Sequence, residues 1–279
     1  MFRFFHVLPL MPGSCRFVCV LLSLLMACCG VRAAEPDAAT ALQCLLKAYP
    51  EVLVEVREDK AVISRNGEVF SYDEALADRS FESLLIRADL RAQMQTPYPA
   101  EPLTRGPAQD IDPGRIRSDR FFKALYGSTE AEVRKHIQAV YWAPCRCYLP
   151  FTQLNGAAAA LRAVGDQIAS DPVLMAYMTT PAGSFNWRNI AGTTRQSVHA
   201  LAAAIDFRLP NNLGRYWRWD GCRTHTECPY PAALLADDVL PRIVRIFESN
   251  GFIWGGKWHH YDAMHFEFRP ELTGPRCRD

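Results

Sequence analysis

Two stretches in the C-terminal half decide the fold: residues 197–206 read Ser-Val-His-Ala-Leu-Ala-Ala-Ala-Ile-Asp, and residues 262–268 read Asp-Ala-Met-His-Phe-Glu-Phe. In the second stretch apolar and polar side chains alternate from residue 264 onward, which predicts a strand with one buried face. Successive side chains of a strand point to opposite faces, so His265 and Glu267 share the face opposite the three apolar residues. We therefore expect His265 to face a cleft and not the core.

The first stretch carries His199 and Asp206, seven residues apart. Alternation predicts a strand over residues 204–209, with Ala204 and Asp206 on one face. Because an unbroken strand would point His199 and Asp206 in opposite directions, the sequence predicts a turn between them. The small residues 202–204 permit the close approach that such a turn requires.

The residue types in the two stretches suit hydrolytic metal chemistry. Two histidines and a carboxylate can hold a zinc ion with one position open, and Asp262 lies near enough to His265 in sequence to act as a base. Taken singly, each fragment has a structural explanation, since a lone histidine on a strand more often forms a hydrogen bond than binds a metal. Together the residues predict a metal-dependent hydrolase.

The rest of the chain alternates helix and strand signals, which indicates an α+β fold: a small antiparallel sheet carrying the site, flanked by helices, with an N-terminal extension that contains a β-hairpin and helices. The hairpin signal surrounds Asn66-Gly67, and residues 96–113 are typical of a linker or long surface loop. Helices are expected at four places: residues 119–126 behind a Ser118 cap, the segment after the capping box Thr129-Glu132, residues 155–169, and a segment that Asp238 caps and Asn250-Gly251 ends.

With their neighbours, the two stretches resemble the zinc D-alanyl-D-alanine carboxypeptidase and dipeptidase family, which contains VanY, VanX and the phage L-alanyl-D-glutamate endolysins. That family carries Ser-x-His-x-x-Gly-x-Ala-x-Asp, followed downstream by a Glu or Asp three residues before a His. The resemblance covers roughly residues 147–272. It implies that His199, Asp206 and His265 bind Zn²⁺ and that Asp262 is the catalytic base.

One position departs from the family pattern. Ala202 replaces the usual glycine, and because alanine adopts a positive φ less readily, we expect the local turn to differ. A second neighbouring residue, Glu267, has two open roles: it orients a metal ligand, or it forms a structural salt bridge.

Family members also place an arginine before the first histidine ligand, where it binds the substrate carbonyl or stabilises the oxyanion. We match Arg188 to this role and keep Arg195 as the rival, with a surface salt bridge as the alternative for either. Ser197, which we expect to brace the site by hydrogen bonding, is a candidate for substrate binding together with Trp258 and His260. Packing in an aromatic rim is the alternative for the last two.

The N-terminus has the pattern of a secretory signal peptide: Arg3 and Arg16 without acidic residues, an apolar run over residues 17–29, and a small-residue cleavage pattern near Ala33. The apolar run is short for a membrane span, so we expect no stable span after its removal. Cys28 stands in an imperfect lipid-attachment site, which leaves a lipoprotein as the alternative.

Charge and cysteine content support this picture. Residues 1–33 hold three of the 31 Lys+Arg and none of the 30 Asp+Glu, so 28 basic residues face 30 acidic ones after cleavage, and nucleic acid is not an expected partner. Six cysteines remain, which indicates disulfides in an exported protein. Cys222 and Cys228, which flank a short polar loop, are the expected local pair. Cys145 and Cys147 are spaced too tightly for a zinc hairpin.

The sequence thus predicts a signal peptide at 1–33, an N-terminal region of unknown role at 34–145 and a zinc peptidase domain at 146–279. The resemblance implies an exported, periplasmic or cell-envelope enzyme that acts on peptidoglycan stem peptides, in the first place as a D-alanyl-D-alanine carboxypeptidase. L-alanyl-D-glutamate or other murein endopeptidase activity is the alternative. A non-catalytic wall-binding module on a peptidase scaffold is the alternative from another class.

Overall fold

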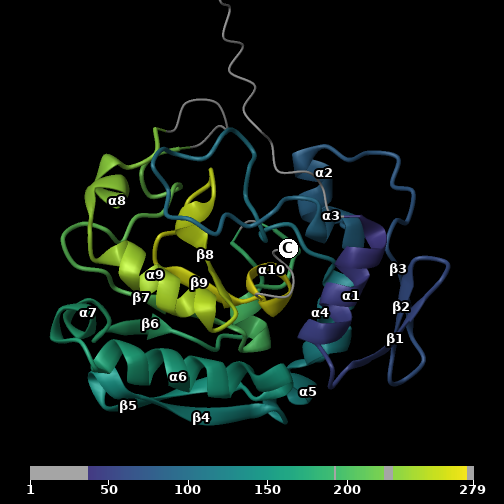
Figure 1. Ribbon diagram of the computed structural model, residues 1–279, viewed down its shortest axis with the longest axis horizontal. Helices are drawn as coiled ribbons and strands as arrows, with labels where there is room; N and C mark the ends of the chain where they lie inside the picture. The colour runs from purple at the N-terminus through teal and green to yellow at the C-terminus, as the bar shows by residue number, and fades with distance from the viewer. Residues whose placement is uncertain (1–36, 192, 223–228, 275–279) are drawn as a thin grey trace, which may run out of the picture. The chain divides into compact units, whose positions relative to one another are not determined.

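The computed structural model describes residues 37–191, 193–222 and 229–274, which belong to one compact unit (Figure 1). The predicted signal peptide at 1–33 lies outside the described residues. Within them, no helix combines the length and the hydrophobicity needed to cross a bilayer. Helices and small antiparallel sheets make up the structure, which confirms the predicted α+β class.

The central sheet carries the site on one face. Its strands follow the order β6-β7-β9-β8, with bounds Pro181–Gly183, Ala204–Phe207, His265–Phe268 and Phe252–Trp254, and each neighbouring pair is antiparallel. β7 and β9 pair so that Asp206 stands opposite His265 and Ile205 opposite Phe266. Ile205 and Phe266 enter the hydrophobic core, so Asp206 and His265 occupy the other face, as strand parity predicted. The prediction for Met264 was wrong, because β9 begins one residue later and Met264 lines the site cavity.

Helices cover the core face of this sheet. α6 (Ala157–Ala169) packs against α9 (Leu240–Ser249) and against the hairpin of β4 (Ile137–Trp142) and β5 (Cys147–Thr152), as Figure 1 shows. Close packing needs small residues here: a Cβ on Gly165 would stand 2.9 Å from the Trp142 ring. The expected cap of α9 was wrong by one residue, since Asp237, and not Asp238, accepts from the backbone N–H of Val239 and Leu240. The remaining helices of this half are α7 (Pro172–Tyr177), α8 (Ala232–Ala236) and α10 (Pro270–Thr273).

The N-terminal region combines a three-stranded sheet with helices. The strands are β1 (Leu53–Arg57), β2 (Ala61–Ser64) and β3 (Val69–Ser71), and the helices are α1 (Ala38–Ala48), α2 (Phe81–Ile86), α3 (Leu90–Met94), α4 (Asp119–Tyr126) and α5 (Glu130–Arg134). The Ser118 cap of α4 and the Thr129-Glu132 capping box of α5 are confirmed. Residues 96–113 contain no helix or strand, as expected of a long loop.

A buried polar network ties the N-terminal region to the sheet. Arg269, fully buried after β9, contacts Glu271 at 2.6 Å and Glu267 at 3.2 Å, and it donates to the carbonyl of Gly114. Tyr49 at the end of α1 donates to the same Glu271 (2.5 Å), and Gln93 of α3 donates to its other oxygen (3.1 Å). The buried charges of Arg269 and Glu271 therefore have partners from both halves of the chain. The predicted boundary at residue 145 stays a prediction.

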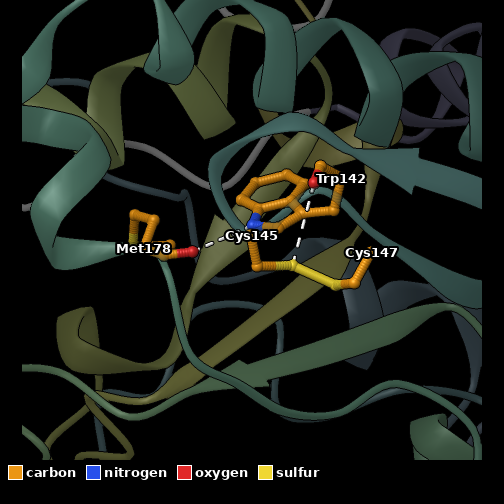
Figure 2. The surroundings of a disulfide bond; sticks show 4 residues. All are labelled: Trp142, Cys145, Cys147 and Met178. Carbon is orange, nitrogen blue, oxygen red and sulfur yellow. Dashed lines mark hydrogen bonds between the residues drawn. A yellow bond between two sulfur atoms is a disulfide. The ribbon is translucent and has the colours of Figure 1, made fainter.

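A disulfide joins Cys145 and Cys147 at the β4–β5 turn (Figure 2). It lies beside Trp142, whose indole N–H donates to the Met178 carbonyl at 2.9 Å. From the sequence this cysteine pair was weighed only as a zinc hairpin, so the disulfide was not predicted. Cys222 also takes part in a disulfide, but Cys228 lies outside the described residues, so their pairing stays a prediction.

Candidate metal centre and substrate cavity

Three predicted ligands converge on one point. His199 Nε2 lies 3.2 Å from Asp206 Oδ1, and His265 Nδ1 lies 3.0 Å from the same oxygen. One ligand atom from each residue lies within 4.8 Å of the others. Two imidazole nitrogens and a carboxylate oxygen at this spacing fit a zinc ion whose fourth position is open to water or substrate.

The predicted turn brings His199 round to Asp206. Ser197 caps the short 3₁₀-helix η3 (Val198–Leu201) and accepts from the backbone N–H of His199 at 3.3 Å. Ala202 ends η3 in the left-handed conformation, with φ 53° and ψ 28°. The turn thus keeps the positive φ that glycine favours, and alanine adopts it at a cost of about 1–2 kcal/mol.

Hydrogen bonds within the cluster set its protonation. Burial alone would raise the pKa of Asp206. Hydrogen bonds from His199 and His265 lower the pKa by more than burial raises it, so it falls below its ordinary value. Burial lowers the pKa of His265, but its contacts with Asp206 and Glu267 outweigh this and raise the pKa to about 10. Zinc has to displace the proton of His265, so we infer that metal binding releases protons.

His199→Ala is expected to lose the metal, because two remaining ligands cannot close a stable site. Elemental analysis should find about one zinc per chain in the wild-type protein and far less in the variant. His136→Ala is the matched control, because that histidine follows α5 and does not line the site cavity. Full zinc retention in His199→Ala would remove His199 from the metal centre.

Asp262, the predicted base, lies three residues before His265. Its Oδ1 is shielded from solvent and has no hydrogen-bond partner among the described residues. Desolvation raises the pKa of Asp262 to about 6, although the charge on His265 opposes the shift. Gly255 permits this placement: it accepts from the backbone N–H of Asp262, and a Cβ on it would stand 2.6 Å from the Asp262 carbonyl.

The predicted site residues line one cavity of about 470 Å³. They are the four residues of the centre (His199, Asp206, Asp262, His265), the two candidate arginines (Arg188, Arg195) and the three candidate substrate contacts (Ser197, Trp258, His260). The fold therefore brings all of them to one hollow on the site face of the sheet. Their individual roles stay predictions.

The two candidate arginines differ in environment. Arg188 is exposed, and its Nη1 donates to the neighbouring carbonyl of Asn189 at 3.2 Å. Arg195 is 7% exposed, and its Nη2 donates to the carbonyl of Arg115 at 3.4 Å. Position alone therefore leaves either arginine available to the substrate.

Trp258 and His260 are both held by the loop before α4. The Trp258 indole donates to the Pro113 carbonyl at 2.8 Å, and its ring centroid lies 5.7 Å from that of His265. His260 Nδ1 lies 2.7 Å from the buried carboxylate of Asp112. One wall of the cavity thus depends on the N-terminal region.

Two residues of this wall, Arg115 and Arg117, were not predicted from the sequence, which left the N-terminal region without an assigned role. A signal was present: the two arginines flank Ile116, which is buried, so alternation alone would have placed them on one side of an extended segment.

For Glu267 the structure shows both contacts left open by the sequence, one to His265 Nε2 (3.4 Å) and one to Arg269 (3.2 Å).

Comparison with known proteins agrees with the geometry. A family model described as D-alanyl-D-alanine carboxypeptidase matches residues 191–268, less than a third of the chain but a stretch that contains the whole candidate centre. No curated protein and no solved structure matches the chain. The segment that carries His199, Asp206, Asp262 and His265 is therefore similar to the D-alanyl-D-alanine carboxypeptidase family of peptidases.

Proposed function

We propose that this protein is a zinc-dependent peptidase that hydrolyses peptidoglycan stem peptides and removes the terminal D-alanine from D-alanyl-D-alanine. The observation that carries the proposal is the convergence of His199, Asp206 and His265 beside the shielded carboxylate of Asp262 in one cavity. The family match supports the peptidase class, and the donor set supports zinc. Export to the cell envelope, where this substrate lies, is part of the proposal and is supported by the signal pattern of residues 1–33.

The side chains of the cavity supply the steps of hydrolysis. Zinc held by the three ligands would polarise the scissile carbonyl and acidify the attacking water. Asp262 accepts the proton of that water and returns it to the leaving amine, for which a pKa near neutrality is suited. Arg188 or Arg195 offers fixed cationic donors to the oxyanion that develops on the carbonyl oxygen. Ser197 keeps His199 in position through its cap.

Mass spectrometry of defined muropeptides tests the proposal. We expect a pentapeptide stem to lose the mass of one terminal alanine when it is incubated with the zinc-loaded protein. Removal of the metal with a chelator should abolish the loss, and added zinc should restore it, because a single ion organises the site. Attachment to sacculi without release of any amino acid or peptide would overturn the proposal in favour of a wall-binding module.

Endopeptidase activity is the second candidate, and one observation favours it. A further hollow of about 910 Å³ adjoins the site cavity and shares Arg115, Arg195, Tyr216 and Trp217 with it. The cleft is therefore long enough to receive more of a peptide than its last two residues. The same experiment distinguishes the two activities, because cleavage between L-alanine and D-glutamate separates L-alanine from the rest of the stem, which is released as one peptide.

A further inference from the structure

We propose that Arg117 and Arg195 form a carboxylate-binding site in the cavity, which receives the free C-terminal carboxylate of the peptide substrate. The inference rests on the proposed peptidase function and deepens it, because it makes recognition of the chain end a property of this protein. It also gives the N-terminal region, which supplies Arg117, a role in substrate selection.

Arg195 is a buried cation in the wall of the cavity. It is 7% exposed and lines the cavity, and its Nη2 donates a 3.4 Å hydrogen bond to the Arg115 carbonyl. Within the described part of the chain, no carboxylate forms an ion pair with it. A buried cation that lacks such a partner is costly unless an anion joins it.

Arg117 approaches the same cavity from the N-terminal region. It is 5% exposed, its Nη2 donates to the Gln196 carbonyl, and the same nitrogen lies 4.0 Å from Asp119 Oδ1. Its Nε is buried and has no hydrogen-bond partner among the described residues. The guanidinium therefore has an N–H group that can donate to a ligand. It lies beside Gln196, the residue that directly follows Arg195.

The two cations act on each other. Burial lowers the pKa of Arg195, the charge of Arg117 acts in the same direction, and the resulting pKa is about 9. Burial also lowers the pKa of Arg117, although Glu267 and Asp119 oppose the shift. A carboxylate placed between the two guanidiniums relieves this repulsion and receives charge-assisted, forked hydrogen bonds.

The position suits the end of a peptide. Arg195 lies four residues before His199 in the chain. The charge of Glu267 raises the pKa of both arginines, and Glu267 also contacts the predicted ligand His265. In a carboxypeptidase substrate the terminal carboxylate belongs to the residue directly after the scissile bond, about 3.8 Å onward in Cα spacing. A cationic pair in the same cavity as the metal centre is thus within reach of that group.

Two substrates that differ in one group test the inference: a stem peptide that ends in D-alanyl-D-alanine, and the same peptide with a C-terminal amide. We expect the zinc-loaded wild-type protein to prefer the acid by about 10- to 100-fold in kcat/KM, the range of a charge-assisted hydrogen bond. Arg195→Met should erase this preference by raising KM for the acid alone. The ratio of the two substrates within one variant is independent of how much protein has folded.

Two further variants sharpen the test. Arg117→Met is expected to reduce the preference in the same way. Arg162→Met is the matched control, because Arg162 lies on α6 with its side chain 62% exposed and pairs with Asp166, and it should keep the wild-type ratio. A second measurement avoids turnover: calorimetry with peptides N-methylated at the scissile amide should show that the wild-type protein binds the acid at least 10-fold more tightly than the amide.

The possible outcomes separate the two proposals. Cleavage of acid and amide at equal rates by the wild-type protein overturns the carboxylate site and leaves the peptidase function intact. An equal fall for both substrates in Arg195→Met also overturns it, because it assigns Arg195 to the scissile carbonyl. Failure to cleave either peptide overturns the proposed function, and the calorimetric comparison then decides on the carboxylate site alone.

Discussion

Asp262→Asn is expected to lower kcat by about 10²- to 10⁴-fold while the zinc content stays at the wild-type level. The amide cannot accept the proton of the attacking water, yet it preserves the volume of the carboxylate, and Asp262 is not one of the three residues whose ligand atoms converge. The measurement is a progress curve of D-alanine release together with elemental analysis of the same sample. Full activity in the variant would remove Asp262 from the role of base.

The pH profile adds a second readout to the same variant. A base works only when deprotonated, so the wild-type rate rises as the pH increases through the pKa of Asp262. Burial raises the pKa of that carboxyl to about 6, and the charge of bound zinc lowers it, so we expect the acid limb at pH 6 or below. Asp262→Asn should lack this limb. Asp166→Asn, a change at an exposed carboxylate on α6, should retain it.

Local signals explain which parts of the fold were predictable from the sequence. The caps of α4 and α5 lie within three residues of the groups they satisfy, so Ser118 and Thr129 mark those helices directly. The parity of β9 likewise needs only neighbouring residues, and it places His265 on the site face. The error at Asp238 is also local, since it is one residue in size. Adjacent aspartates are equally good caps by residue type, and Asp237 is the one that accepts from the backbone N–H groups at the start of α9.

The features that sequence reasoning missed depend on contacts between distant segments. Nothing in the sequence near Arg117 indicates that it lines the same cavity as Arg195, because the 77 residues between them must first fold. The first helix, α1, was missed although Asp37 caps it, and its end at Tyr49 reaches Glu271 near the opposite end of the chain. Family motifs located the metal centre, but the wall built by the N-terminal region lies outside the matched segment.

Ala202 shows how tertiary context overrides a local preference. The sequence predicted a different turn at this position because alanine disfavours a positive φ. The structure keeps the left-handed conformation, since Ala202 and Ala203 are fully buried in the core that η3 shares with α1 and α4. Their packing holds the turn at the angle that His199 needs, and the strain of one residue is small beside the burial it permits.

Arg269→Met is expected to destabilise the metal-free protein by about 3–5 kcal/mol, the cost of leaving buried carboxylates without their cation. Arg269 is fully buried and contacts both Glu267 and Glu271, which are themselves 2% and 1% exposed. Urea unfolding measures the change. Arg242→Met is the matched control: Arg242 pairs with Asp171 near the surface, with side chains 52% and 30% exposed, so its removal should cost less than about 1 kcal/mol.

The pH dependence of the Arg269→Met deficit identifies its origin. Burial raises the pKa of Glu267, but the contacts with His265 and Arg269 lower it to about 2, so in the wild-type protein this carboxylate contributes stability above its ordinary pKa and loses it as the pH falls toward 2. Without Arg269 that contribution shrinks, and the deficit is therefore largest at neutral pH and diminishes in acid. A deficit that is constant with pH would instead assign the effect to lost packing. Because Glu267 also contacts the ligand His265, a charge-dependent loss would mean that the N-terminal region and the metal centre share one electrostatic network, held together at Arg269.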